Sequence, residues 1–473
     1  MIDKKGFIEY LKVAKSSDSN SVLKNDTQKT YIACMDCFKI EGWFNSLYEF
    51  AEIDDELDKK IRKHPYFKLF NKATKSSCGS ALKNYKEYLE DDSYLKTEVE
   101  SYLPQVNNNS QCFNHRTIEM IIQYMKSKGF VYSDSQIANF YLALKTKPFV
   151  LLAGISGTGK TRLARLFAEA VGATQDGRYL QVAVRPDWSD SSDIFGYKNL
   201  KGEFEVGNIT KFIAKAMSDL YNPYFLVLDE MNLARVEYYF SDFLSLLETR
   251  DLQCDGTLRS DAILKDEIQA WVAAEGLDVE LFKDGIYLPQ NLYVIGTVNM
   301  DESTFPFSKK VLDRAITIEF NDVELKSNDV VTGTVQPLAD IDNSYFLSSY
   351  HSMIDVNEKD KTDDANNIID VICKWNDILK KAHLNIGYRV RNDILFYALY
   401  AQELKLPLEE YNPLDYCMMQ KILPRIQGSS NAIETVLEGL DDVLSSNEYP
   451  MSKEKIHYML ERLKSDGFTA FWL

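Results

Sequence analysis

The amino-acid sequence predicts an α/β fold, in which a parallel sheet with helices on both faces lies between a helical N-terminal domain and a helical C-terminal lid. Two observations predict this fold. Between residues 149 and 320, short apolar runs alternate with segments of helical periodicity. Outside that part of the chain, apolar residues recur at helical spacing without such runs. The predicted domains are residues 1–110, 111–325 and 326–473.

The N-terminal domain is predicted from helical spacing at residues 30–50, 53–61 and 81–89. A charged stretch that becomes Pro- and Asn-rich, residues 91–111, is interpreted as a linker. Two amphipathic helices, residues 116–128 and 134–144, follow it.

The strands of the sheet are predicted at residues 149–153, 179–184, 224–230, 291–299 and 316–320. The connecting segments are predicted helices at residues 161–171, 209–221 and 236–249, a polar loop at 185–200 and an insertion at 252–286. From residue 321 the chain becomes polar, and the lid helices are predicted at residues 366–382, 391–404, 415–422 and 452–465.

Length and composition exclude several classes of protein. The chain has 473 residues, of which 45% are hydrophobic, which is enough for sizeable cores. No apolar segment approaches the ~20 residues of a membrane span, and the first residues do not form a signal-peptide core. The seven cysteines are an odd, scattered set, which favours reduced thiols. We therefore expect a soluble cytoplasmic protein without a membrane partner.

The charge is unevenly distributed. Residues 1–132 hold 20 basic and 19 acidic side chains, whereas the remainder holds 34 and 52, and the whole chain has a net charge of −17. An acidic surface disfavours non-specific binding of nucleic acid. If the protein contacts DNA, the near-neutral N-terminal domain is the better candidate for that contact, unless a partner makes it.

A glycine-rich turn follows the first predicted strand. Residues 154–161 read Gly-Ile-Ser-Gly-Thr-Gly-Lys-Thr and fit the pattern G-x-x-x-x-G-K-[ST]. Only glycines let the backbone curl closely enough for its N–H groups to surround a polyphosphate. A chance match is disfavoured, because the turn lies between a buried strand and an amphipathic helix. The predicted nucleotide-binding residues are Gly154, Ser156, Gly157, Thr158, Gly159, Lys160, Thr161 and Arg162.

Polar residues at the ends of later strands complete a candidate catalytic site. Asp229 is predicted to hold Mg²⁺ together with Thr161, and Glu230 to polarise the attacking water. Asn299, at the end of the next strand, is predicted to orient that water. Two acids at a strand end also occur as an ordinary turn, but the phosphate loop upstream favours the catalytic interpretation.

Two arginines are candidates for contact with the γ-phosphate. Arg314 is predicted to act in trans on a neighbouring subunit's nucleotide, and the alternative is an ion pair with Asp313. Arg389, at the start of a lid helix, is predicted to sense the γ-phosphate, and Arg391 competes for that role.

Several phrases resemble the McrB-like branch of AAA+ P-loop NTPases, the motors of modification-dependent restriction systems. They are Arg185-Pro-Asp-Trp-Ser-Asp, Leu228-Asp-Glu-Met-Asn-Leu-Ala-Arg, Gly296-Thr-Val-Asn-Met and Gln420-Lys-Ile-Leu-Pro-Arg. The resemblance covers residues 130–430 and implies an AAA+ core that hydrolyses ATP or GTP with Mg²⁺ in a ring, expected to be a hexamer. It also implies a separate McrC-like nuclease subunit as partner, with DNA contacted through the N-terminal domain.

The same resemblance adds one catalytic residue. The family carries an Asn-x-x-Asp signature, and here Asn299-Met-Asp-Glu302 has Glu302 at the position of the acid. Asp301 is an alternative, and the family's following arginine is replaced by Ser303.

Two other functions fit part of the pattern. One is a MoxR-like ATPase that remodels client proteins or loads cofactors into them, which shares the order of strands and motifs. The other is a binding module that uses nucleotide only for assembly, which the presence of Lys160, Glu230 and Asn299 disfavours.

Overall fold

A computed structural model describes residues 82–83, 110–130, 132–253, 257–300, 305–321, 335–338, 341–359, 361–408 and 412–472. The chain divides into two compact units, Met1–Asn108 and Asn109–Leu473. Apart from Leu82 and Lys83, every described residue belongs to the second unit. The predicted N-terminal helices, the linker before residue 110 and Glu302 therefore lie outside the described residues.

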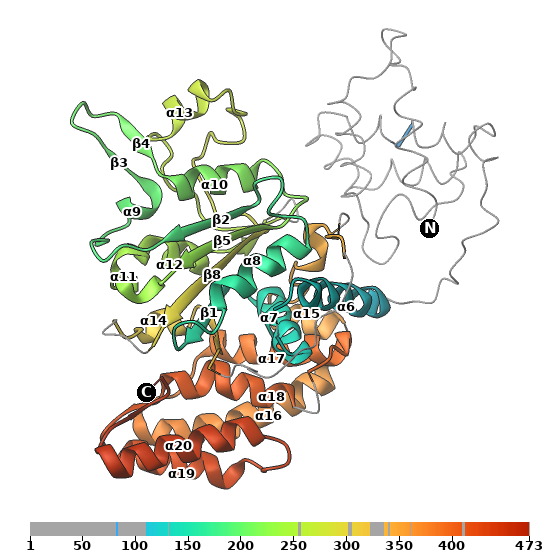
Figure 1. The fold of residues 1–473 in the computed structure, drawn as a ribbon, viewed down its shortest axis with the longest axis vertical. Coiled ribbons are helices and arrows are strands. Elements are labelled where there is room, and N and C mark those ends of the chain that lie inside the picture. Colours follow the sequence, from blue (N-terminus) through green and yellow to red (C-terminus); the bar gives the residue numbers. More distant parts are fainter. Residues whose placement is uncertain are drawn as a thin grey trace, which may run out of the picture. The chain divides into compact units, whose positions relative to one another are not determined.

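The five predicted strands form one parallel sheet (Figure 1). The strand order is β2-β5-β8-β1-β9, with β1 at Phe149–Gly154, β2 at Tyr179–Ala183, β5 at Tyr224–Asp229, β8 at Leu292–Asn299 and β9 at Ile316–Glu319. Gly154 lies opposite Asn299 at one end of the sheet, and Asp229 lies opposite Ala183 at the same end. The parallel register thus brings the polar strand ends of the sequence motifs to one edge.

Helices cover both faces of this sheet, as predicted, because side chains of β1 alternate between two cores. Val150 and Leu152 face the core that contains α7 (Asp134–Thr146) and α8 (Lys160–Ala170). Phe149, Leu151 and Ala153 face the core that contains α10 (Asn208–Met217) and α12 (Ser241–Glu248). This confirms the predicted α/β class.

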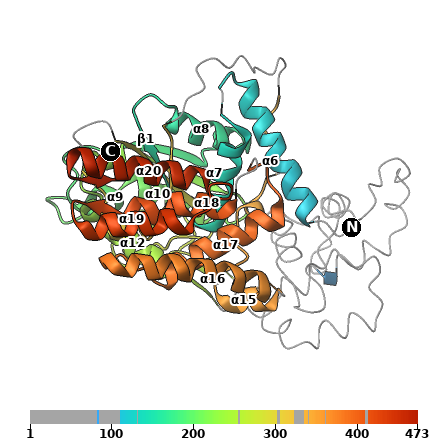
Figure 2. The same ribbon diagram turned by 90° about the horizontal axis from the view of Figure 1, so that it is seen from below.

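The C-terminal part is helical (Figures 1 and 2). It contacts β9, the strand at one edge of the sheet. Its longer helices are α16 (Thr362–Leu379), α17 (Tyr388–Leu404), α19 (Asn431–Val443) and α20 (Pro450–Asp466). Between α17 and α19 lie α18 (Pro413–Cys417), the π-helix η5 (Met418–Ile422) and the short 3₁₀-helix η6 (Leu423–Arg425). Among the described residues, no helix is long and apolar enough to cross a membrane.

The remaining elements complete the chain as the structure describes it. Before β5 they are α6 (Ser110–Ser127), α9 (Ser192–Phe195), β3 (Gly196–Lys198) and β4 (Phe204–Val206). Between β5 and β9 they are η2 (Met231–Leu233), α11 (Val236–Tyr239), β6 (Asp251–Leu252), β7 (Leu258–Arg259), α13 (Gln269–Ala274) and α14 (Lys309–Leu312). After β9 they are η3 (Asn343–Tyr345), α15 (Met353–Glu358), η4 (Lys380–Ala382), β10 (Gln427–Gly428) and β11 (Thr469–Ala470).

The structure differs from the sequence prediction within residues 185–200, within residues 236–249 and in the lid. The end of the predicted loop at 185–200 enters the antiparallel hairpin β3–β4, whose turn is held by the Asn199 side chain, which accepts the N–H groups of Lys201 and Glu203. The predicted helix at 236–249 is two helices, which meet at Phe240. Helix α19 was not predicted, although Ile433, Val436, Leu437 and Leu440 bury one face of it.

Candidate nucleotide-binding and catalytic site

The glycine-rich turn joins the carboxyl end of β1 to the first residue of α8. Two of its glycines cannot be replaced by another residue without a clash or backbone strain. A Cβ at Gly154 would lie 2.3 Å from the carbonyl oxygen of Phe320, and Gly159 has φ of 91°, in the left-handed region. The predicted residues of this turn therefore form a closed loop at the N-terminus of α8, where backbone N–H groups attract anions.

Lys160 directs its charge into this loop. Its side chain is buried, with 5% exposure, and Nζ donates to the carbonyl oxygens of Gly154 and Ile155 at 3.0 and 2.5 Å. Thr158 also donates to Ile155, so the loop is closed by its own side chains. An ammonium held at this point is positioned to meet the phosphates that the loop surrounds.

Neighbouring elements fix the loop from outside. The amide oxygen of Asn321, just after β9, accepts the N–H of Ile155 at 3.1 Å. The phenol of Tyr132 donates to the carbonyl oxygen of Gly159 at 3.0 Å, and burial raises the pKa of Tyr132 to about 12, so the phenol keeps its proton. Arg162 stacks on the ring of Phe130, with 4.4 Å between the guanidinium carbon and the ring centroid. Sequence reasoning did not identify Asn321 or Tyr132.

The two predicted Mg²⁺ ligands are in contact. The Thr161 hydroxyl donates to Oδ1 of Asp229 at 2.7 Å, and Gln181 on β2 donates to Oδ2 at 3.0 Å. A hydroxyl and a carboxylate beside a phosphate loop are the hard oxygen donors that Mg²⁺ uses together with water and phosphate. The residues therefore fit a magnesium ion.

Thr297 on β8 is a further member of this site. Its hydroxyl, in a side chain only 2% exposed, donates to Oδ1 of Asp229 at 2.6 Å and accepts the backbone N–H of Glu230 at 3.1 Å. A single hydroxyl thus holds both acidic residues. The sequence could have indicated Thr297 as a site residue, because it precedes Asn299 by two residues and therefore lies on the same face of the strand.

Glu230 and Asn299 lie side by side. Asn299 Nδ2 donates to Oε1 of Glu230 at 3.2 Å. Glu230 has φ of 54° and ψ of 49°, a left-handed conformation that costs a non-glycine residue about 1–2 kcal/mol. Such conformations persist where the surroundings hold them, which is common at functional sites. The predicted water-polarising and water-orienting residues are therefore adjacent.

A cavity of about 510 Å³ lies next to the phosphate loop. Its wall comes from the start of α7, the end of β9 and the lid, and includes Asn139, Glu319, Asn321, Gln420, Lys455 and Tyr458. Asn139 accepts hydrogen bonds from Gln420 at 2.5 Å and from Tyr397 at 2.8 Å, and Glu319 pairs with Lys455 at 2.6 Å. The volume is in the range of small-molecule sites, and the wall presents the side-chain amides of Asn139, Asn321 and Gln420.

Arg314 and Arg389 meet at the opposite end of the sheet. Both guanidinium groups pair with the same oxygen, Oε1 of Glu248, the last residue of α12. The hydrogen bond from Arg314 lowers the pKa of the Glu248 carboxyl, despite partial burial. Asp313 instead pairs with Arg425 at 3.3 Å, and Arg391 hydrogen-bonds to Asn392.

The sheet register fixes how far Arg314 is from the phosphate loop of its own chain. Val150 lies opposite Ile316, which makes Arg314 level with Pro148, six residues before Gly154. At about 3.3 Å per residue, this separation is on the order of 20 Å along the strands. Arg314 therefore cannot complete the site of its own chain, and Arg389, which shares its partner, lies with it.

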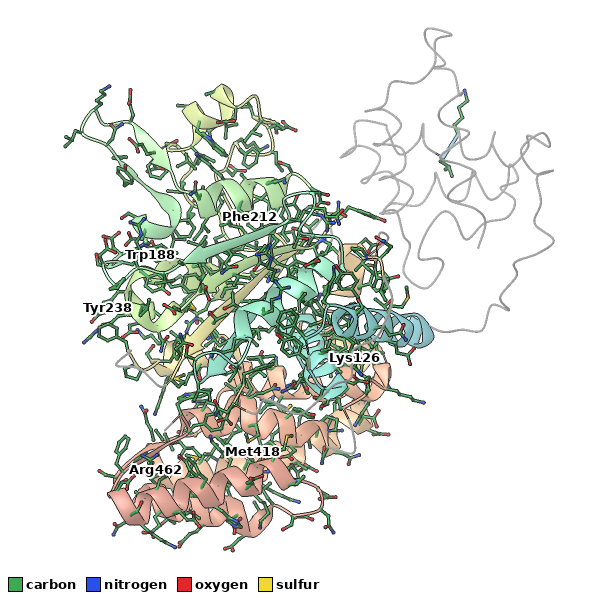
Figure 3. All side chains as sticks on the ribbon, viewed as in Figure 1. Lys126, Trp188, Phe212, Tyr238, Met418 and Arg462 are labelled. Atoms are coloured by element: carbon green, nitrogen blue, oxygen red, sulfur yellow. The ribbon has the colours of Figure 1, made fainter. Side chains whose placement is uncertain are left out.

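One phrase quoted for the resemblance has a structural role. Trp188, labelled in Figure 3, is 8% exposed and packs edge-on against Tyr239, with 5.3 Å between ring centroids. It belongs to the core that covers one face of the sheet. Trp188 itself thus contributes to the fold.

Two family models match parts of the chain. Residues 149–316 match the model of the AAA domain, dynein-related subfamily, and residues 338–468 match a family described as a domain of unknown function (DUF8727). A crystallised protein of Cytophaga hutchinsonii ATCC 33406, described as a candidate ATPase, is similar at 16% identity with a TM-score of 0.42, over 70% of this chain and 96% of that one. No curated protein matches the chain. The phosphate loop, the parallel sheet and this family match together show that residues 149–316 form an AAA domain.

Proposed function

We propose that this chain hydrolyses a nucleoside triphosphate at the interface between identical copies. The observation that carries the proposal is the division of the site across the sheet. The phosphate loop, Asp229, Glu230 and Asn299 gather at one end, and Arg314 lies about 20 Å away at the other. When copies pack head to tail, Arg314 of one copy meets the phosphate loop of the next.

The reaction follows from these positions. Glu230 accepts a proton from water while Asn299 keeps its carboxylate oriented, and the water oxygen attacks the γ-phosphorus. The bond from that phosphorus to the β–γ bridging oxygen breaks, which gives a nucleoside diphosphate and inorganic phosphate. Thr161 and Asp229 would hold Mg²⁺, which neutralises charge on the phosphate oxygens when it is bound.

Head-to-tail contacts close into a ring when the rotation from one copy to the next equals a full turn divided by the number of copies. We expect a hexamer, on the resemblance to McrB-like motors. In such a ring each copy supplies one nucleotide pocket and one arginine, so every site needs two chains. Glu302 is proposed to assist Asn299, and Arg389 to contribute to the site that Arg314 enters.

The cellular role rests on the sequence phrases. We propose the motor subunit of a McrBC-like restriction system in the cytoplasm, with a McrC-like nuclease as partner and DNA contacted by the N-terminal domain. The match to the dynein-related AAA family fits a MoxR-like remodelling ATPase at least as well. A neighbouring nuclease gene would favour restriction, and a neighbouring von Willebrand-type domain gene would favour remodelling.

The experiment that tests the activity is phosphate release from ATP and from GTP. Each nucleotide is assayed with Mg²⁺, with and without DNA and the product of the adjacent gene. Stimulation by DNA and a nuclease would support the restriction role, and stimulation by a non-nuclease client would support remodelling. Absence of turnover with either nucleotide under every condition would overturn the proposed hydrolysis.

A further inference from the structure

The phrase Gln420-Lys-Ile-Leu-Pro-Arg425 forms an unusual piece of the lid. It lies in the π-helix η5, which begins at Met418 (labelled in Figure 3), and continues into the 3₁₀-helix η6. Pro424 has no N–H to donate, so an α-helix cannot continue through it. π-Helical turns are rare and occur frequently at functional sites. The nucleotide chemistry described above uses only the first residue of this phrase, at the cavity wall.

Lys421 holds the main chain on both sides of Arg314. Its ammonium, in a side chain only 2% exposed, donates to the carbonyl oxygen of Leu312 at 3.2 Å and to that of Ala315 at 2.7 Å. The first oxygen belongs to the C-terminus of α14, where a cation is favoured, and the second precedes β9. One buried charge therefore fixes the turn that carries Arg314.

Arg425 makes a second contact with the same turn. Its guanidinium lies 3.3 Å from Oδ1 of Asp313, the residue before Arg314, and its side chain is 9% exposed. Arg314 in turn donates to the carbonyl oxygen of Lys310 at 2.7 Å. The position of the turn that carries Arg314 thus depends on the lid of its own chain.

The buried carboxylate of Asp393 connects Lys421 to the sheet. Asp393 on α17 pairs with Lys421 at 2.9 Å and with Lys147, just before β1, at 2.6 Å. Burial raises the pKa of Asp393, but the two ammonium groups outweigh it and hold the pKa below its usual range. Lys147 shares the carboxylate with Lys421, and among the described residues its ammonium hydrogen-bonds to Asp393 alone.

Gln420, the neighbour of Lys421, contacts the other site. It lines the cavity beside the phosphate loop and donates to Asn139 on α7 at 2.5 Å. Consecutive residues of η5 therefore touch the cavity beside the phosphate loop of this chain and the turn that presents Arg314 to the next chain.

We propose that Lys421 is a positioning residue for hydrolysis in trans: it holds the turn of Arg314 in place and joins that turn to the nucleotide cavity of its own chain. This inference rests on the proposed action of Arg314 on a neighbouring copy. It assigns to the lid a role in the adjacent active site, in addition to its role in the wall of its own cavity.

The test is turnover of the full-length Lys421→Met variant, with Lys147→Met as the matched control. Both substitutions remove one ammonium from Asp393, but only the first releases the Arg314 turn. We expect Lys421→Met to lower kcat at least about tenfold, with little change in KM, because a misplaced arginine weakens transition-state contacts. Lys147→Met is expected to stay within about twofold of wild type. Equal losses in the two variants would overturn the proposal, since they would reflect the shared ion pair.

Mixing experiments distinguish a role in trans from a role in the variant's own pocket. Lys421→Met has an intact pocket, so adding inactive Glu230→Gln, which keeps its Arg314 turn, should restore turnover. Absence of restoration would contradict the proposal. If Lys421→Met does not fold, Lys421→Gln, which keeps a shorter donor, is tested in the same way. The Arg314→Ala and Glu230→Gln mixture is the reference: if that mixture also stays inactive, the proposed function fails rather than the role of Lys421.

Discussion

The amide nitrogen of Asn299 lies 3.2 Å from the carboxylate of Glu230, across the junction between β8 and β5. The two residues are 69 positions apart in the chain, and the parallel register of the sheet brings them together. Both lie at the strand ends that also carry the phosphate loop and Asp229. The contact links an amide to the carboxylate that is proposed to accept a proton from water.

Replacing Glu230 by Gln should abolish turnover and spare nucleotide binding. The amide keeps the size of the side chain and cannot accept the proton, and general bases contribute about 10²- to 10⁴-fold to rate. We therefore expect kcat to fall at least about 100-fold, measured as phosphate release, with the affinity for a fluorescent nucleotide analogue retained. The control is Asp242→Asn, an acid-to-amide change at an exposed position of α12. Wild-type turnover in Glu230→Gln would remove Glu230 from the mechanism.

Replacing Thr297 by Val tests the hydroxyl that holds both acidic residues. The change preserves shape and removes the bonds to Asp229 and to the N–H of Glu230. We expect turnover to fall roughly tenfold or more and the Mg²⁺ concentration for half-maximal activity to rise, because about 1–3 kcal/mol of hydrogen bonding at the site is lost.

The matched control for Thr297 is Thr317→Val on β9. Thr317 is 1% exposed, and its hydroxyl has no hydrogen-bond partner among the residues that the structure describes. Removing an unsatisfied hydroxyl is expected to leave turnover unchanged and stability equal or higher. If the two valine variants behave alike, the role assigned to Thr297 is wrong.

Replacing Asp415 by Ala should loosen the lid. The buried Asp415 carboxylate accepts the N–H groups of Met451 and Ser452 at 3.0 and 2.9 Å, which lie in the first turn of α20. Loss of these bonds is expected to cost about 2 kcal/mol in the free energy of unfolding, measured by urea or thermal unfolding. Nucleotide affinity should fall as well, because α20 lines the cavity. Asp442→Ala, at an exposed position of α19, should change stability by less than about 0.5 kcal/mol; an equal loss in both variants would refute the assignment.

The sequence predicted the sheet well because its strands are continuous apolar runs with polar ends. Residues 149–153 and 224–230 became β1 and β5 within one residue at each end. The common position of the phosphate loop, Asp229, Glu230 and Asn299 could be predicted from these strands, because parallel strands place their carboxyl ends at one edge of the sheet. These features depend on local patterns that a single sequence contains.

The contacts that the sequence did not predict are between distant segments. Nothing near Glu248 indicates that it pairs with Arg314 and Arg389, since both arginines come from later parts of the chain. Lys421 reads as an ordinary basic residue on a lid helix, and only the fold buries its ammonium against the carbonyl oxygens around Arg314. The hairpin β3–β4 was missed for another reason, because each of its strands has only three residues, too few for an alternating pattern to be recognised.

The central claim, cleavage at a site shared by two copies, is tested most directly by mixing Arg314→Ala with Glu230→Gln and measuring phosphate release. Each variant alone should be inactive, the first for lack of the arginine and the second for lack of the base. In randomly mixed rings about a quarter of the interfaces join an intact pocket to an intact arginine, so the account predicts up to that fraction of wild-type turnover. Full activity of Arg314→Ala alone, or no activity in the mixture, would contradict it.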